Sequence, residues 1–235
     1  MSEIASALPQ HPNAAALTLT PAEHRLLDQL KIDKTLALDH FGLAPNDEET
    51  ARFIRLLGND HSVSVGVAAL VERLYAQVTE AFGAQSAWVT LRASLPNHKF
   101  DVPRWHIDGY FYEPFQGAQY KAAIALKGPG TLFASLNDEW RSAFLECMMQ
   151  HNPSNPLDDR IKLAKMIAEQ GQVTMTGERQ GAVFAVGDRK ASTIHSEPPV
   201  NAPRLFLSIV PGTRDQIAAL KKRWSNNNKP AANAT

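Results

Sequence analysis

Cysteine, net charge and long apolar runs are all scarce in this sequence. A single cysteine, Cys147, among 235 residues excludes an intramolecular disulfide framework and favours a reducing compartment. Lysine plus arginine equal aspartate plus glutamate at 24 each, so no overall field favours nucleic acid or an anionic membrane as a partner. No segment approaches the ~20 apolar residues that cross a bilayer, and residues 1–19 lack the basic and apolar regions of a secretory signal. We therefore expect a cytoplasmic protein with no membrane partner.

The length and composition predict one domain with a sizeable core. Residues 1–20 are rich in alanine, proline, asparagine and serine without periodicity, which predicts a flexible N-terminus. Residues 225–235 include three asparagines in a row at their start and predict a disordered tail. The domain between them, 21–224, has three expected parts: helical support over 21–83, a strand-rich core over 86–211, and a helical insert over 138–170.

Helix signals dominate the first part of the domain. Thr20, Pro21 and Glu23 form a capping box with proline in the first turn, and an acidic run at 47–50 opens a second helix. Residues 64–82 carry apolar side chains at intervals of three and four, so we expect an amphipathic helix that lies against a sheet.

Strand signals follow from residue 87 onward. Residues 87–95 alternate and favour β structure, and short strand-like runs recur to about residue 210. Helices followed by many short strands predict an antiparallel sandwich or barrel backed by N-terminal helices. The further strands are expected at 104–108, 120–126, 131–134, 172–176, 181–186 and 204–210, with a closing helix at 214–224.

A possible metal site lies in the segment expected as the strand 104–108. Side chains two residues apart on a strand share a face, so His106 and Asp108 could bind one ion. His195, just before a strand-like run, could supply a third ligand. Two histidines and one carboxylate suit non-heme Fe(II), because they leave coordination positions open. Two other interpretations stay open: His195 as a loop histidine that caps backbone, and Arg204 as a surface arginine paired with a carboxylate such as Asp188.

The ordered series of these features resembles the Fe(II)- and 2-oxoglutarate-dependent dioxygenase superfamily. The resemblance covers residues 86–211. It implies a fold of the mainly β class with α (α+β), namely a double-stranded β-helix (jelly roll) with N-terminal supporting helices and a helical insertion. The motifs that carry it are His106-Ile107-Asp108, the turn Gly128-Pro129-Gly130, Gly181-Ala182-Val183-Phe184, His195, and Arg204 nine residues later.

The resemblance also implies a set of site residues. His106, Asp108 and His195 would bind Fe(II), and Arg204 would bind the distal carboxylate of 2-oxoglutarate through two parallel hydrogen bonds. The implied reaction converts this co-substrate to succinate and CO2 while an unidentified substrate is hydroxylated or otherwise oxidised. The sequence departs from some families, which place a serine or threonine two residues after the arginine, because Phe206 stands there. The candidates for further co-substrate contacts are Ser208, Lys121 and Arg92.

Aromatic and charged residues around the His-x-Asp motif are candidates for substrate contact. They are Arg104, Trp105, Tyr110 and Tyr112, and the aromatic ones fit equally well as core residues at a barrel rim. The substrate could be a small molecule or a peptide or protein side chain. Two alternatives remain at this stage: a cupin-type metalloprotein whose chemistry does not use 2-oxoglutarate, and a non-catalytic jelly-roll binding module.

Overall fold

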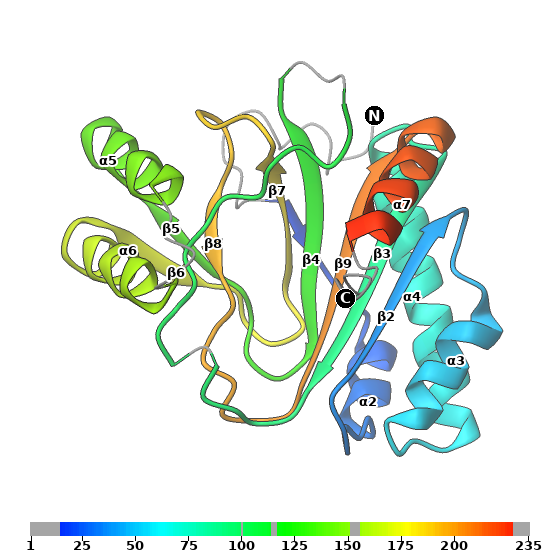
Figure 1. Cartoon of the computed structure of the whole chain (residues 1–235). Helices are drawn as coiled ribbons and strands as arrows, with labels where there is room; N and C mark the ends of the chain where they lie inside the picture. Colours follow the sequence, from blue (N-terminus) through cyan, green and yellow to red (C-terminus); the bar gives the residue numbers. More distant parts are fainter. Residues whose placement is uncertain (1–14, 100, 114–116, 151–155, 228–235) are drawn as a thin grey trace, which may run out of the picture.

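The computed structural model describes residues 15–99, 101–113, 117–150 and 156–227 (Figure 1). Residues 1–14 of the expected flexible N-terminus and residues 228–235 of the expected tail lie outside this range. The described part contains two antiparallel sheets, one of six strands and one of three, with helices on their outer sides. No helix in the described ranges combines the length and apolar character needed to span a membrane.

The large sheet has the strand order β1-β7-β4-β9-β3-β2, and the small sheet has the order β6-β5-β8. The strands of the large sheet are β1 (Ala15–Leu17), β2 (Leu36–Gly42), β3 (Ser86–Ser94), β4 (Gln119–Lys127), β7 (Gly181–Val186) and β9 (Arg204–Gly212). Those of the small sheet are β5 (Leu132–Ser135), β6 (Gln172–Met175) and β8 (Ile194–Ser196). The helices are α2 (Pro21–Asp28), α3 (Asp47–Leu56), α4 (His61–Ala81), α5 (Asp138–Met149), α6 (Pro156–Gln170) and α7 (Arg214–Asn227).

The chain passes back and forth between the two sheets, and this alternation defines the fold. From β3 in the large sheet the chain crosses to His106, whose backbone pairs with His195 of β8 in the small sheet. It then returns to β4. It then enters β5 and β6, returns to β7, crosses to β8, and ends in β9. Two antiparallel sheets wound alternately in this way form a double-stranded β-helix, so the predicted jelly roll is confirmed.

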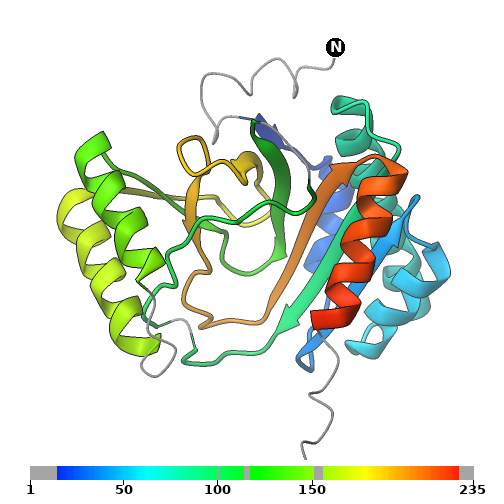
Figure 2. The same cartoon turned by 45° about the horizontal axis from the view of Figure 1, so that its top comes forward.

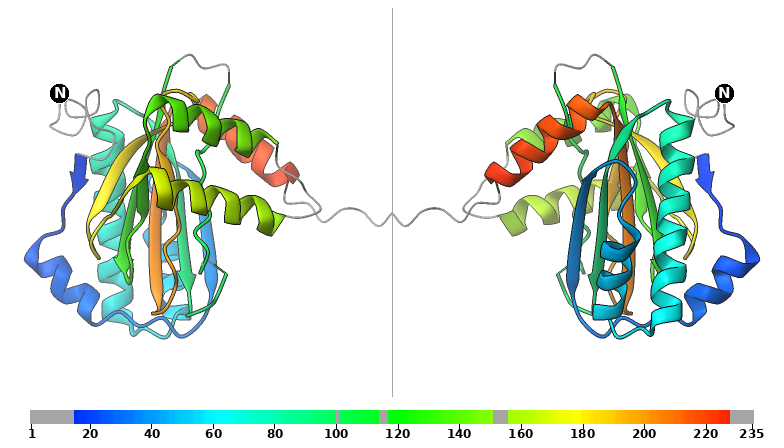
Figure 3. Two further views of the ribbon diagram at one scale, coloured as in Figure 1. Left: turned by 90° about the vertical axis from the view of Figure 1, so that its left-hand side faces the viewer. Right: turned by 90° about the vertical axis from the view of Figure 1, so that its right-hand side faces the viewer.

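Helices cover the outer faces of both sheets, and Figure 3 shows the two coverings from opposite sides. Inward residues of α4 such as Val71 and Leu74 pack in one cluster with Leu91 of β3 and Leu207 of β9. The predicted amphipathic helix therefore does lie on a sheet. On the other side, Phe144 of α5 and residues of α6 pack against the small sheet. The inner faces of the two sheets are left to form the interior of the jelly roll.

Several elements differ from the sequence-based expectation. Residues 104–108 do not form a strand, because only His106 pairs, by backbone hydrogen bonds of 3.0 and 2.9 Å to His195. The expected helical support over 21–83 includes a strand, β2, which pairs with β3 along its whole length. At the ends, β1 lies inside the expected flexible N-terminus and pairs with β7, and α7 continues to Asn227, beyond the expected start of the tail.

The capping signals were read correctly for α2. Thr20 accepts a hydrogen bond from the backbone of Glu23, whose carboxylate accepts one from the backbone of Thr20 at 2.7 Å. Glu23 also pairs with Arg73 of α4, so the same carboxylate caps α2 and ties it to α4. This contact fixes α2 against α4.

Candidate metal centre and its cavity

Three side chains converge where the His-x-Asp segment meets β8. One ligand atom from each of His106, Asp108 and His195 can be chosen so that all lie within 4.8 Å of one another. Nε2 of His106 lies 3.6 Å from Oδ1 of Asp108, and Nε2 of His195 lies 3.4 Å from Oδ2. The backbone bridge between the two histidines brings the distant third residue into place.

Backbone carbonyls orient both imidazole rings. Nδ1 of His106 lies 2.7 Å from the carbonyl oxygen of Arg104, and Nδ1 of His195 lies 3.0 Å from that of Thr193. A carbonyl only accepts, so each Nδ1 carries the proton and each Nε2 offers a lone pair to the centre. Metal-binding histidines need this tautomer and commonly hold it through such a contact.

Local charges favour the protonation states that a divalent cation requires. Burial would raise the pKa of Asp108, but the charge of Lys121 and the contacts with both histidines hold it well below its usual value. Burial and the neighbouring His106 lower the pKa of His195. An ionised Asp108 beside a neutral His195 fits the donor set of a site for Fe(II) or a similar ion.

Lys121 of β4 holds the carboxylate from one side. Its Nζ donates to Oδ2 of Asp108 at 2.9 Å, and both side chains are mostly buried. Nζ also lies 5.9 Å from the ring centroids of Phe111 and Phe184. Lys121 is therefore paired with a candidate metal ligand, and its contact with 2-oxoglutarate stays a prediction.

Arg204 opens β9 and reaches the same cavity. Its side chain is 6% exposed, its Nε donates to the carbonyl of Pro129 at 2.8 Å, and its Cζ lies 4.6 Å from the ring centroid of Phe206. Gly128 lets this turn approach, because a Cβ there would lie 2.6 Å from the carbonyl oxygen of Pro203. Among the described residues no carboxylate lies within ion-pair distance of Arg204, and Asp188 instead accepts from the backbone of residues 190 and 191.

The three candidate ligands and Arg204 line one cavity of about 470 Å³ between the inner faces of the sheets. Such a volume fits a small co-substrate together with part of a substrate. The cavity is lined by Trp88, Thr90, Arg92, Ser94, Lys99, Arg104, His106, Asp108, Phe111, Lys121, Thr131, His195, Ser196, Glu197, Arg204, Phe206, Ser208 and Trp224.

The other two candidates for co-substrate contact differ in their surroundings. Arg92 faces the cavity, but its guanidinium donates to both oxygens of Asp39 on β2, each at 3.0 Å. Ser208 is buried on β9, where it pairs with Thr90 of β3, and it lines the cavity. Of these two, only Ser208 has a side chain that is not already committed to an ion pair.

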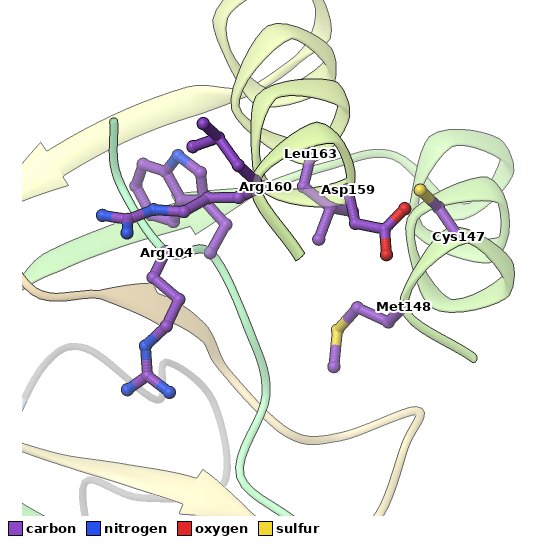
Figure 4. Close-up of a pocket in the computed structure, with 8 residues that line it drawn as sticks. Arg104, Cys147, Met148, Asp159, Arg160 and Leu163 are labelled. Atoms are coloured by element: carbon purple, nitrogen blue, oxygen red, sulfur yellow. The ribbon is translucent and has the colours of Figure 1, made fainter. Parts of the chain in front are cut away.

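The candidates for substrate contact point to different sides of their segment. Arg104 lines the cavity and pairs with Glu197 at 2.5 Å, and this contact holds the pKa of Glu197 at about 2 despite its burial. Trp105 is buried in the core beneath α5 and α6 and lines a second cavity. Figure 4 shows that Arg104 lines this second cavity as well. Tyr110 contacts the glycine at 187, and Tyr112 is buried with its hydroxyl on the carbonyl of residue 211. Among these four, Arg104 alone lines the cavity of the candidate metal centre.

Sequence reasoning missed part of the cavity wall. Trp88 and Trp224 line it, although one comes from β3 and the other from the closing helix. Asp39 was missed with its strand, and it accepts hydrogen bonds from Trp88 Nε1 and Thr90 Oγ1 as well as from Arg92. The period-two pattern of β3 could have placed Trp88 on the face of Thr90 and Arg92, because alternate residues of a strand share a face.

The fold and the three converging side chains define a double-stranded β-helix protein with a candidate two-histidine, one-carboxylate metal centre. No model of a protein family matches the sequence, and neither does any curated protein. Similar solved structures include a prolyl-4-hydroxylase of Pseudomonas putida, at 13% identity and a TM-score of 0.42, with 90% of this chain and 97% of that chain covered.

Two more similar structures are a dioxygenase for auxin oxidation of rice and the non-heme alpha ketoglutarate dependent carbocyclase SnoK of nogalamycin biosynthesis. The rice protein is 11% identical, with 92% of this chain and 79% of that chain covered and a TM-score of 0.43. SnoK is 9% identical, with 89% and 83% covered and a TM-score of 0.41. All three are distant likenesses, and the description of the site rests on the geometry of this chain.

Proposed function

We propose that this protein is an Fe(II)- and 2-oxoglutarate-dependent oxygenase. The observation that carries the proposal is Arg204, a buried guanidinium with no carboxylate partner among the described residues, in the cavity that holds His106, Asp108 and His195. An unpaired buried charge costs stability, so such a residue calls for an anionic ligand. A dicarboxylate that reaches from the metal to this arginine supplies that ligand.

The chain's own residues have distinct roles in this proposal. His106 and His195 bind Fe(II) through Nε2, and Asp108 binds it through its carboxylate. Lys121 keeps that carboxylate in position through the bond to Oδ2. Bound Fe(II) supplies oxidising chemistry in which 2-oxoglutarate and oxygen are consumed, succinate and CO2 are released, and a substrate is oxidised.

Arg204 binds the distal carboxylate of 2-oxoglutarate. Its Nε is held by the carbonyl of Pro129, so the orientation of the guanidinium plane is set before the ligand arrives. Ser208, buried on the same face of β9, can donate a further hydrogen bond. A reducing cytoplasm suits both ferrous iron and the single cysteine, and we propose it as the compartment.

The test follows succinate formation by purified protein with Fe(II), ascorbate, oxygen and 2-oxoglutarate. We expect slow turnover without added substrate. We also expect Arg204→Met to raise the concentration of 2-oxoglutarate at half-maximal turnover by at least about tenfold, because a charge-assisted pair is lost. Arg73→Lys, on α4 outside the cavity, is the matched control and should leave turnover unchanged.

Metal binding separates this proposal from a cupin-type activity that does not use 2-oxoglutarate. Titration with Mn(II) should give the same affinity in the wild type and in Arg204→Met, since Arg204 contacts Pro129 and Phe206, neither of which is a candidate ligand. Tight Mn(II) binding with no succinate formed would favour the cupin-type alternative. Absence of any Mn(II) binding would favour the non-catalytic module.

A further inference from the structure

We infer that the cavity takes a substrate group that is an uncharged, flat aromatic ring, bound against Phe111, Phe206 and Trp224. This inference rests on the proposed function for what is done to the substrate, although the binding itself needs no metal. It follows from the arrangement of the aromatic side chains and from the way the charges of the cavity are paired.

The aromatic wall is built from three parts of the chain that the fold brings together. Phe111 follows the His-x-Asp motif, Phe206 is the third residue of β9, and Trp224 comes from α7, which lies across β3 and β2 (Figure 2). All three line the cavity and are only partly buried. Their ring surface is therefore available inside the cavity.

A buried tryptophan fixes this wall from behind. The ring centroid of Trp88 lies 4.7 Å from that of Trp224 and 5.7 Å from that of Phe111, and the other side of Trp88 stacks on Phe41 at 5.4 Å. Its Nε1 donates to Asp39 at 3.1 Å, so the indole plane is set by a hydrogen bond as well as by packing. Rings held in place lose little freedom when a ligand stacks on them.

The closing helix is tied to the metal-binding segment beside its tryptophan. Nη2 of Arg223 donates to the carbonyl oxygens of Tyr110, at 3.2 Å, and of Phe111. The residue next to Trp224 thus binds the backbone of the segment that supplies Phe111. The two outer members of the wall are consequently held together.

The wall also lies next to the candidate ligands. Lys121 Nζ lies 2.9 Å from Oδ2 of Asp108 and 5.9 Å from the ring centroid of Phe111. One side chain therefore separates the acidic ligand from the aromatic wall. A ring bound there has a substituent within reach of the metal centre.

Charge pairing sets the character of the substrate group. Five lysine and arginine side chains line the cavity: three are each bound to a carboxylate, Arg204 is assigned to the co-substrate, and Lys99 is exposed to solvent. A charged substrate group in the inner part of the cavity, away from Lys99, would have to break one of these pairs or stay unpaired, and both cost free energy. The three pairs are Arg92 with Asp39, Arg104 with Glu197, and Lys121 with Asp108.

The competing explanation is that Trp224 only anchors α7. It does pack in one cluster with Trp88, Tyr112, Ile217 and Leu220. A pure anchor would affect the melting temperature and leave ligand binding by the folded protein unchanged. A binding wall changes both, and the second effect is the one to measure.

The experiment uses three probes with the full chain and saturating 2-oxoglutarate. They are 2-naphthol (flat and neutral), 2-naphthoate (flat and anionic) and decahydro-2-naphthol (neutral and not flat). Binding is measured by saturation transfer from protein to probe, which needs no metal. We expect 2-naphthol to bind at least about fivefold more tightly than either of the others, since stacking is worth about 1 kcal/mol.

Variants locate the binding. Trp224→Ala and Phe111→Leu should each weaken 2-naphthol binding by about fivefold, while Trp224→Phe keeps a ring and should retain most of it. Trp140→Ala on α5, outside the cavity lining, is the matched control for loss of a tryptophan. Melting temperatures measured beside each titration identify a variant that has lost its fold, and Phe111→Leu then serves in place of Trp224→Ala.

Three results would overturn the inference: equal affinity for 2-naphthol and its saturated counterpart, stronger binding of 2-naphthoate, or binding that Trp224→Ala and Phe111→Leu leave unchanged. Failure of the proposed function is a separate outcome. It would appear as no succinate and no Mn(II) binding while 2-naphthol still binds at the aromatic wall. With Mn(II) bound, faster relaxation of the naphthol ring protons would additionally place the ring near the metal.

Discussion

The two faces of the six-stranded sheet are built from the same strands and carry opposite chemistry. On β3, Val89 and Leu91 face α4, whereas Thr90 and Arg92 face the cavity. On β9 the same alternation separates Leu207 from Arg204. The outer face is a continuous apolar core, which stabilises the fold by removing hydrocarbon from water. The inner face buries charged side chains. This burial lowers the stability of the fold but provides groups that can bind a ligand.

Arg204 shows the cost of the inner face most clearly. Burial lowers its pKa to about 10, although the charge of Glu197 acts in the opposite direction. The guanidinium remains charged at neutral pH, but the fold disfavours that charge. Substitutions on the two faces should therefore separate function from stability.

Loss of the acidic ligand should have the largest effect on function. Asp108→Ala removes one of three candidate ligands, so we expect Mn(II) affinity to fall by at least about 100-fold and succinate formation to cease. Isothermal titration measures the affinity. Asp101→Ala, an exposed aspartate paired with His98, is the matched control. Unchanged Mn(II) affinity in Asp108→Ala would refute the assignment of this ligand.

Truncating a side chain on the outer face should lower stability and leave metal affinity unchanged. Leu74 of α4 is fully buried in the main core, so Leu74→Ala should lower the free energy of unfolding by about 3 kcal/mol. Urea denaturation measures this loss. Mn(II) affinity of the folded protein should stay at the wild-type value, because no candidate ligand packs in that cluster. A parallel loss of metal binding would show that the two faces are coupled.

Arg204→Met should move function and stability in opposite directions. Affinity for 2-oxoglutarate falls, whereas the free energy of unfolding without ligand should rise by about 1 kcal/mol, because a buried unpaired charge is replaced by an apolar side chain. Urea denaturation without and with 2-oxoglutarate measures both. The wild type should gain stability on adding the ligand and the variant should not. Destabilisation of the unliganded variant would mean that Arg204 is a structural residue.

The smallest expected effect is the change in the free energy of unfolding when Glu23 of α2 is replaced. Burial would raise the pKa of Glu23, but hydrogen bonds from Arg73 and Thr20 bring it below its usual 4.5. A carboxylate with a depressed pKa contributes stability above pH 4.5, and that contribution is lost as the pH falls below this value. Glu23→Gln should therefore cost about 1 kcal/mol at pH 7 and nothing once Glu23 is protonated. Denaturation at several pH values tests this, and a constant difference would disprove the electrostatic origin.

Local patterns in the sequence predicted several helices and strands correctly. The capping box at Thr20, the apolar spacing of α4 and the continuous apolar run of β7 all depend on nearby residues. The strand β2 was missed because Asp39 and His40 stand at its centre and its residues do not alternate clearly between buried and exposed. β2 pairs with β3, which lies far away along the chain, and no local sequence pattern predicts such a pairing.

The missed strand bears on the role of Arg92, whose contact with a co-substrate stays a prediction. Arg92 faces inward as the alternation of β3 predicts, but its partner Asp39 comes from β2. Without that strand Arg92 looks available for a co-substrate. The candidate metal ligands were easier to select, because their types and order single them out, and the structure brings the three side chains together even though residues 104–108 do not form a strand. The sequence could not identify Trp224 as a residue of the cavity wall, because its neighbours depend on how α7 packs against the sheet.

The bridge between His106 and His195 joins segments that lie far apart along the chain, as does the pairing of β3 with β9. Contacts of this kind give a high contact order and slow the folding of jelly rolls. During synthesis the helices α2 to α4 and strand β3 emerge early, but β3 has to wait for β9 before its inner edge is paired. Since His195 and Arg204 emerge near the end, an incomplete chain cannot hold the ion through all three ligands. If the protein binds iron as proposed, all three candidate ligands are in place only after β8 has docked, so the ion would hold together parts of the chain that are made at different times.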